Sequence, residues 1–194
     1  MDPAEIVLRA KAELRKRLRG LRNTHPAAAL ARRSERIVET LDKLDAIASA
    51  KTVALFWPIE TRHEVDVRDL DTRLRARGVA IAYPSIEESG EMTFRVATVD
   101  ELTEDPLGFR GAPRSAIEPD AIDAIVVPAI ALDTEGRRLG YGAGFYDRAL
   151  PRFAPAKKIG VAYDFQLLVE VPVSPNDVTM DIVVTDARTI AVAR

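Results

Sequence analysis

The sequence predicts an α/β fold, a single-domain three-layer sandwich in which helices flank a mostly parallel, Rossmann-like sheet. Short apolar segments rich in β-branched residues alternate along the chain with segments of helical periodicity, as they do in such folds. The chain has 194 residues, the length of one typical domain, and shows no internal repeat, low-complexity tract or clear domain boundary. We therefore expect residues 1–194 to form one domain.

Two helices are predicted at the N-terminus. The first spans residues 2–21, and Lys11 falls inside its apolar stripe, with Arg22 near the same stripe. A lysine in that position either extends to the surface or points into a polar pocket. The second helix starts within residues 24–26, and its apolar face continues to Ala48.

A strand, a helix and a second strand are predicted next. Residues 51–57 are apolar and rich in strand-forming types, and Pro58 stops them. Residues 65–77 return to helical spacing and end before a glycine, and residues 79–83 form a second strand that stops at Pro84. This order predicts a right-handed crossover between two parallel strands.

The second half of the chain contains the predicted centre of the sheet. Residues 92–96 alternate as an exposed or edge strand does, and the segment 100–120 has the composition of a long surface loop. The longest apolar run, residues 122–132, predicts a buried central strand. Shorter strands are predicted at 158–164, 182–185 and 189–192.

A glycine-rich loop follows the central strand. Residues 136–150 have the sequence GRRLGYGAGFYDRAL, and a helix is predicted from about Ala143. A strand, a glycine-rich loop and a helix in this order bind phosphate, because backbone N–H groups can approach an anion closely. The same segment adds a cation at Arg138, an aromatic ring at Tyr146 and a possible magnesium ligand at Asp147. These features predict a nucleotide site.

Three loops are expected near this site. Ligands of open parallel sheets bind beyond the carboxyl ends of the strands, which brings together residues 57–64, 134–145 and 164–166. Asp177 and Asp181 precede the strand at 182–185. They can join the site only if that strand is antiparallel or if the loop before it folds back.

Composition excludes several classes of function. The net charge is −2 without an extended basic cluster, so we expect no nucleic-acid partner. The chain has no cysteine and only two histidines, which argues against thiol chemistry and against zinc sites. The N-terminal segment is charged and polar, without the apolar core of a signal peptide, and no apolar run approaches the ~20 residues of a membrane span, so we expect no membrane partner and a cytoplasmic location.

Four segments resemble, in order, the motifs of the 5-formyltetrahydrofolate cyclo-ligases, also called methenyltetrahydrofolate synthetases. The sequence RLGYGAGFYD at 138–147 is similar to the family pattern R-L-G-x-G-x-G-Y-Y-D. KAELR at 11–15 resembles an N-terminal K-x-x-x-R, EVD at 64–66 a folate-binding E-[IV]-[DE], and NDVTMD at 176–181 a C-terminal H/N-D-x-x-[LVM]-D. A lone glycine loop would be a weak signal, but four ordered motifs are a strong one.

The resemblance implies a reaction that depends on ATP and Mg²⁺ and converts 5-formyltetrahydrofolate to 5,10-methenyltetrahydrofolate. In the family's scheme the formyl oxygen takes the γ-phosphoryl group, N10 closes onto the activated carbon, and ADP and phosphate are released. Phosphoryl transfer needs cations and oriented N–H groups around the phosphoryl oxygens, and no covalent nucleophile. The partners implied are small molecules, and we expect a monomer.

The resemblance also implies roles for individual residues. Lys11, Arg138 and Tyr146 are the implied catalytic residues, and Asp147 and Asp177 the implied Mg²⁺ ligands. The implied ATP-binding residues are Lys11, Arg15, Arg138, Leu139, Gly140, Tyr141, Gly142, Ala143, Gly144, Phe145 and Tyr146. The implied substrate-binding residues are Phe56, Trp57, Glu64, Tyr141, Phe145 and Tyr146, with Glu64 accepting hydrogen bonds from the pterin.

The chain departs from the family pattern in places. Phe145 stands where the family usually has tyrosine, and Ala143 where glycine or lysine is common; a Cβ at 143 disfavours positive φ. The segment from Phe56 to Glu64 is slightly longer than usual, so Glu60 is an alternative to Glu64 as the folate ligand.

Other interpretations stay open. The chain can be a family-like protein that binds folate or nucleotide without turnover, or, by fold analogy alone, a sugar-phosphate isomerase or CoA-transferase. The glycines can simply shape a tight turn, and Asp177 and Asp181 can be cap and turn residues. Tyr146 and Trp57 can be core residues, the latter under the first helix.

Overall fold

A seven-stranded sheet forms the middle of the computed structural model, which describes residues 2–104, 110–112 and 115–193. The strands are β1 (Thr52–Ala54), β2 (Ala80–Ile86), β3 (Met92–Val96), β6 (Ala124–Pro128), β9 (Lys157–Val161), β11 (Ile182–Val184) and β12 (Thr189–Ala191). Their order is β12-β11-β9-β6-β1-β2-β3. The inner pairings are parallel, while β12 and β3 are antiparallel to their neighbours. This confirms the predicted α/β class.

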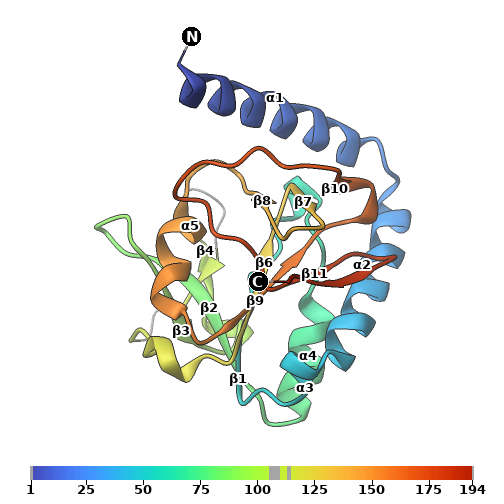
Figure 1. Cartoon of the computed structure of the whole chain (residues 1–194). Coiled ribbons are helices and arrows are strands. Elements are labelled where there is room, and N and C mark those ends of the chain that lie inside the picture. Colours follow the sequence, from blue (N-terminus) through green and yellow to red (C-terminus); the bar gives the residue numbers. More distant parts are fainter. Residues whose placement is uncertain (1, 105–109, 113–114, 194) are drawn as a thin grey trace.

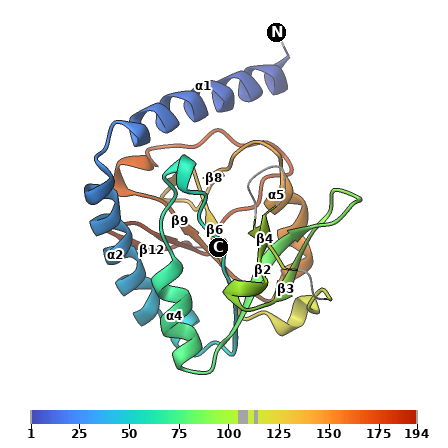
Figure 2. The same cartoon turned by 180° about the vertical axis from the view of Figure 1, so that it is seen from behind.

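Helices cover both faces of this sheet. The α-helices of the described chain are α1 (Pro3–Asn23), α2 (Ala27–Lys43), α3 (Asp45–Ala48), α4 (Arg68–Ala76) and α5 (Phe145–Ala149). Figures 1 and 2 show α2 and α4 on one face and α5 on the other. The strands serve both layers, because successive side chains point to opposite faces: Val126 of β6 packs in the α2/α4 core and Val127 in the α5 core. The three-layer arrangement is thus built by alternation within fully buried strands.

The long apolar run at 122–132 was predicted to form one strand, and this prediction was wrong because the run contains two strands. Its second half forms β7 (Ala131–Asp133), which leaves the main sheet and pairs with β10 (Leu167–Leu168) and β8 (Arg138–Leu139) in a small second sheet. Ile130 and Ala131 have no exposed surface, so the run stays buried through the change of sheet. Continuous burial keeps the composition apolar, and composition therefore did not reveal the break.

Strand ends also differ from the prediction. The strand predicted at 51–57 keeps only the three residues of β1, and β2 continues through Pro84 instead of stopping there. Proline interrupts a strand where its missing N–H would have donated to a neighbouring strand, and it is tolerated where that side has no partner. Strand β1 pairs with β2 no further than Ala82, so Pro84 lies where β2 pairs with β3 alone. The edge strand predicted at 92–96 is confirmed as β3.

Two predicted helices have different limits. The second helix ends at Lys43, because Leu44 has an extended backbone, and α3 continues the apolar face with the buried Ile47. The helix predicted at 65–77 starts only at Arg68. Within the segment 100–120, predicted as a loop, the described parts contain two-residue strands, β4 (Thr103–Glu104) and β5 (Arg110–Gly111), and short 3-10 turns; residues 105–109 and 113–114 lie outside the described chain.

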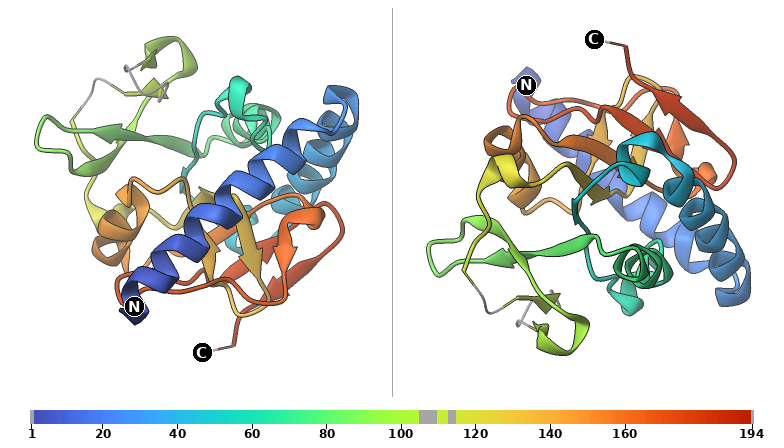
Figure 3. Two further views of the ribbon diagram at one scale, coloured as in Figure 1. Left: turned by 90° about the horizontal axis from the view of Figure 1, so that it is seen from above. Right: turned by 90° about the horizontal axis from the view of Figure 1, so that it is seen from below.

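Helix α1 lies across one end of the sandwich (Figure 3). Its first turn is capped as predicted, with Ala4 N donating to Asp2 Oδ1 over 3.1 Å. Leu18 packs with Ile130 and Leu139 on the small sheet and anchors the helix there. In the described residues no helix has the length and apolarity needed to cross a membrane. The helix thus covers the end of the sheet where the parallel strands terminate.

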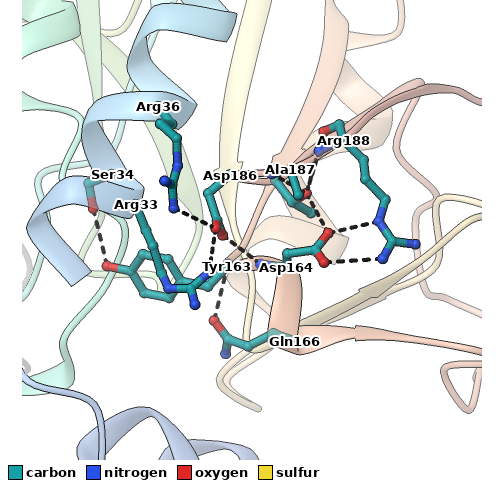
Figure 4. A network of polar contacts seen from close by, with 10 residues as sticks. Arg33, Ser34, Arg36, Tyr163, Asp164, Gln166, Asp186, Ala187 and Arg188 are labelled. Carbon is teal, nitrogen blue, oxygen red and sulfur yellow. Dashed lines mark hydrogen bonds and ion pairs between the residues drawn. The ribbon is translucent and has the colours of Figure 1, made fainter. Parts of the chain in front are cut away.

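A polar network fixes the loops after β9 and β11 to α2 (Figure 4). The side chain of Asp186 is 2% exposed; it forms ion pairs with Arg33 and Arg36 of α2 and accepts a hydrogen bond from Asp164 N at 2.8 Å. Gln166 is buried and donates to Ile130 O at 2.6 Å. Residues 164–166, predicted to join the ligand site, are therefore used to hold neighbouring loops together.

Candidate active site

A cavity of about 330 Å³ lies between α1, the glycine loop and the segment after β1. Its size is within the range of small-molecule sites. The lining residues are Leu8, Lys11, Arg15, Phe56, Trp57, Ile59, Arg62, Glu64, Pro128, Arg138, Leu139, Gly140, Tyr141, Gly142, Ala143, Gly144, Phe145, Tyr146, Asp147, Ser174 and Asp177. This set contains all the residues that the sequence motifs placed in the site. The fold brings them together, and their individual roles stay a prediction.

The positions of the glycines in the loop have different structural causes. Gly142 and Gly144 have φ of 105° and 69°, which a residue with a side chain rarely adopts. At Gly140 an added Cβ would lie 2.4 Å from Nη1 of Arg138, so the loop passes directly over that guanidinium. Among the described non-glycine residues only His63 has positive φ, and Ala143 therefore takes an ordinary conformation. The departure at Ala143 is compatible with the loop.

The loop connects different elements from those predicted. It follows β8 of the small sheet, not the central strand, and it leads into α5, which has only five residues. The dipole of such a short helix is small because few peptide units are aligned. Any phosphate bound here would depend on the N–H groups of the loop itself and on neighbouring cations.

Lys11 points into the cavity from α1. It is 5% exposed, its Nζ donates to Ser174 Oγ at 2.8 Å, and it forms an ion pair with Asp177. Asp177 also accepts from Ser174 N at 2.7 Å and so closes a turn, the conservative interpretation of that residue. The burial of the Lys11 side chain beside Ser174 and Asp177 is consistent with the interpretation that Lys11 points into a polar pocket.

Asp177 reaches the cavity because the loop before β11 folds back. Strand β11 is parallel to β9, so residues directly before it lie at the far end of the sheet. Asp181 is at that end, where it accepts from Lys158 N at 2.8 Å. Of the two alternatives considered for these aspartates, the folded-back loop is the one observed, and only Asp177 lines the cavity.

Arg138 is enclosed below the glycine loop. Its side chain is 3% exposed, and Nη2 lies 3.0 Å from Asp147 Oδ1. Nη1 donates to Pro128 O at 3.4 Å, the guanidinium lies 5.5 Å from the centre of the Tyr146 ring, and Nε has no hydrogen-bond partner in the described chain. The predicted phosphate-binding cation and a predicted metal ligand are therefore paired with each other.

Arg15 completes the group of cations. Its Nε donates to Gly140 O at 2.8 Å, which fixes the guanidinium against the glycine loop. Burial, followed by the charge of Arg19, lowers the pKa of Arg15 from its usual value. Arginine is protonated far above neutral pH, so the side chain remains a cation.

Glu64 also lines the cavity. Its Oε2 accepts from Ile59 N at 2.8 Å. Burial raises the pKa of Glu64, while the hydrogen bonds from Ile59 N and the Tyr141 hydroxyl act in the opposite direction. The alternative residue Glu60 is exposed, pairs with Arg68 at 3.0 Å and does not line the cavity. Of the two glutamates, Glu64 is the one available to a ligand there.

Aromatic side chains surround Glu64. Phe56 is buried and Trp57 is half-buried, with its ring edge-on to Tyr83 at 6.2 Å between ring centres. Tyr146 is 7% exposed, and its hydroxyl has no hydrogen-bond partner among the described residues. Burial raises the pKa of Tyr146, so the hydroxyl is a neutral donor at physiological pH. Tyr146 is both a core residue and part of the cavity wall, and Trp57 faces the cavity.

Two arginines of this region were not predicted. Arg22 of α1 is 1% exposed and donates to Tyr141 Oη at 2.9 Å. The guanidinium of Arg62 lies 4.9 Å from the centre of the Tyr141 ring. The only sequence signal for Arg22 was its place near the stripe of Lys11, and Arg62 had none.

The carboxylates of the cavity fit a magnesium ion held together with a nucleotide. No group of three or more potential metal ligands occurs in the described residues. Asp147 and Asp177 are close neighbours, since Val178 N donates to Asp147 Oδ1 at 3.4 Å. Mg²⁺ is commonly bound by one or two carboxylates, with phosphate and water oxygens as the other ligands. Two carboxylates beside a glycine-rich loop are compatible with that requirement.

Comparison with known proteins gives a consistent result. The sequence model described as the 5-formyltetrahydrofolate cyclo-ligase family matches residues 7–186. A 5-formyltetrahydrofolate cyclo-ligase of Mycolicibacterium smegmatis is 34% identical over 199 residues, covering 96% of this chain and 98% of that protein.

Solved structures agree. A 5,10-methenyltetrahydrofolate synthetase of Aquifex aeolicus superposes with a TM-score of 0.84 and 31% identity, over 95% of this chain and 93% of that one. A 5,10-methenyltetrahydrofolate synthetase of Mycoplasma pneumoniae gives a TM-score of 0.74 and 26% identity, over 91% and 98% of the two chains. The similarity therefore covers nearly the whole chain in both sequence and fold.

Proposed function

Because the chain belongs to the 5-formyltetrahydrofolate cyclo-ligase family and is thus an enzyme of the ligase class, we propose that it converts 5-formyltetrahydrofolate to 5,10-methenyltetrahydrofolate with ATP and Mg²⁺. The observation that carries this proposal is that two kinds of residue line one cavity. A glycine loop with Lys11, Arg15 and Arg138 is one group, which we call the triphosphate half, and Glu64 with several aromatic residues is the other, which we call the folate half. The first half suits a triphosphate and the second a pterin.

The triphosphate half would bind ATP through charge and backbone N–H groups. Lys11, Arg15 and Arg138 are cations on its walls, and the loop from Gly140 to Phe145 can turn its amides to the phosphates. Asp147 and Asp177 would hold Mg²⁺, which when bound neutralises charge on the phosphate oxygens. These residues orient the γ-phosphoryl group; none of them acts as a covalent nucleophile.

The folate half would orient the second substrate. The Glu64 carboxylate accepts hydrogen bonds from N–H groups of the pterin, and Phe56, Trp57 and Tyr146 pack against its ring. Phe145 also lines this region, with the guanidinium of Arg148 5.4 Å from the centre of its ring. A ring fixed in this way places the formyl oxygen toward the phosphate half of the same cavity.

The proposed reaction has two steps. The formyl oxygen attacks the γ-phosphorus, the bond to the ADP oxygen breaks, and an imidate-like phosphate forms. N10 then adds to the activated carbon and loses its proton, and the carbon–oxygen bond breaks to release phosphate. Arg138 stabilises the charge that develops on the phosphoryl oxygens in the first step. We propose that the enzyme acts as a monomer in the cytoplasm.

Turnover of 5-formyltetrahydrofolate with ATP tests the proposal. The absorbance of methenyltetrahydrofolate should appear only when ATP and Mg²⁺ are both present, together with one ADP for each product molecule. Omission of ATP and chelation of the metal are the controls. Binding of folate or ATP without product would support instead a binding protein that has lost turnover, which the phenylalanine at position 145 motivates, and absence of both would refute the assignment of this site.

A further inference from the structure

Arg22 is an almost fully buried cation outside the set of motif residues. It lies on the last turns of α1 and is 1% exposed. Nη1 donates to Arg62 O at 3.0 Å and to Tyr141 Oη at 2.9 Å, and Nη2 donates to Ala129 O at 3.2 Å. Nε has no hydrogen-bond partner in the described chain. One side chain thus connects α1 with three separate segments next to the cavity.

The contact with Tyr141 has a fixed direction. A guanidinium can only donate hydrogen bonds, so the oxygen of Tyr141 must accept from Arg22. The hydroxyl proton of Tyr141 is then free to point elsewhere, and its partner is the Glu64 carboxylate. The result is a one-way chain of hydrogen bonds from Arg22 through Tyr141 to Glu64.

This chain determines what Glu64 presents to the cavity. Its Oε2 also accepts from Ile59 N, so both known partners of the carboxylate are donors. A carboxylate with two oxygens has further lone pairs that can accept from a ligand. Donors on the protein side favour the ionised form, which accepts hydrogen bonds and does not donate them.

We infer that Arg22 is a positioning residue for the folate half of the site, acting through Tyr141 to hold Glu64 as an ionised acceptor for the N–H groups of a pterin. The inference rests on the proposed function and adds a residue of α1 to it. Arg22 is not among the residues that line the cavity, so its effect on the substrate would be indirect.

Other charged and titratable groups also face Glu64. Arg62 from the 3-10 turn after β1 lowers the pKa of Glu64, as does Arg22 from α1, and both act against burial, which raises it. Tyr141 from the glycine loop and Tyr146 from α5 interact with Glu64 electrostatically as neutral phenols. Removal of Arg22 therefore removes one of the two arginines that lower the pKa of Glu64 and weakens the preference for the ionised carboxylate.

The test compares steady-state kinetics of the wild type with those of Arg22→Met. We expect the KM for 5-formyltetrahydrofolate to rise by about tenfold or more while kcat changes by less than about threefold, as for a lost ground-state contact. The acid limb of kcat/KM for the folate should move to higher pH, because the ionised form of Glu64 is less favoured. Arg22→Lys restores the charge without the three-way contact and should bring the limb back toward its original pH.

Arg95→Met is the matched control. Arg95 is also mostly buried, has an unpartnered Nε and donates to a backbone carbonyl, Ala112 O, at 3.2 Å, but it does not line the cavity or touch its walls. A general loss of stability would affect both variants. If Arg22 positions Glu64, only Arg22→Met should change the KM for the folate and shift the acid limb of kcat/KM, and Arg95→Met should change neither.

The outcomes separate the two proposals. An inactive wild type would refute the proposed function, and the inference would fall with it. An active wild type with an unchanged folate KM and limb in Arg22→Met, or with the same changes in Arg95→Met, would refute the inference alone. If Arg22→Met does not fold, Tyr141→Phe decides, because it removes only the hydroxyl between Arg22 and Glu64; an unchanged folate KM in that variant would overturn the inference.

Discussion

Replacement of Arg138 by methionine is the most direct test of the triphosphate half of the site. The side chain is 3% exposed, and its guanidinium pairs with Asp147 at 3.0 Å directly below the glycine loop. Methionine has a similar length and no charge, so Arg138→Met keeps most of the packing and removes the cation. The variant therefore reports on charge at the proposed phosphoryl position.

Two effects of different size are expected from Arg138→Met. Loss of one charged donor to a developing oxyanion lowers kcat/KM by about 10²–10³, or about 3–4 kcal/mol. Loss of one partner of a fully buried ion pair destabilises a fold by about 3–5 kcal/mol. Asp147 is 23% exposed and can be hydrated once it is unpaired, so we expect a loss of only about 1–3 kcal/mol here.

The assay measures kcat/KM for ATP and the midpoint of thermal unfolding for the wild type, Arg138→Met and Arg137→Met. Arg137 is the neighbouring residue, but its side chain is 24% exposed and pairs with Glu135, Glu170 and the buried Asp133, none of which lines the cavity. Because Arg137 and its partners lie outside the cavity, the kcat/KM of this control should stay within about threefold of the wild type, even if loss of the contact with Asp133 lowers its unfolding temperature. If Arg138→Met had the same kcat/KM as the control, the placement of the γ-phosphoryl group beside Arg138 would be wrong.

Three further results are expected. Burial raises the pKa of Glu64, so its contribution to stability is present below the ordinary value of 4.5 and is lost as pH rises through the folded-state pKa. Glu64→Gln should therefore unfold at a higher temperature than the wild type at neutral pH and at the same temperature in acid. The same variant should bind folate more weakly. Gly140→Ala should lower kcat/KM by about tenfold or more by displacing Arg138, whereas Gly20→Ala, in open space on α1, should stabilise the fold by about 0.5–1 kcal/mol in a denaturant titration. Mg²⁺ and ATP should each raise the affinity measured for the other by calorimetry, and equal ATP affinity with and without the metal would contradict this.

The sheet could be predicted from the sequence where the pattern of apolar residues changes between strand and helix spacing along the chain. The alternation of apolar strands with helices gave the α/β class, and the edge position of β3 followed from its alternating pattern. The change of sheet between β6 and β7 left no signal, because both strands are buried. Strand pairing depends on contacts distant in sequence, and local composition does not report them.

Lys11 and Arg138 were selected from the sequence because four motifs occur in order, since the stripe position of Lys11 or the glycine loop alone was a weak signal. The structure places both residues on the wall of one cavity, and their roles stay a prediction. The fold-back of the chain that brings in Asp177 depends on tertiary contacts such as its ion pair with Lys11. Arg22 could not be identified, because its partners are a tyrosine hydroxyl and backbone carbonyls of remote segments.

The pairing of charges in the cavity explains why ATP and Mg²⁺ should bind together. Lys11 pairs with Asp177 and Arg138 with Asp147, so that no cation of these two pairs is left uncompensated in the enclosed site. A triphosphate alone would compete with the aspartates for the cations and leave two carboxylates unpaired next to an anion. A metal ion alone would leave the two cations unpaired next to its own charge. When both bind, the phosphates take the cations and the metal takes the carboxylates, so every charge keeps a partner, and each ligand removes the penalty that the other would meet alone.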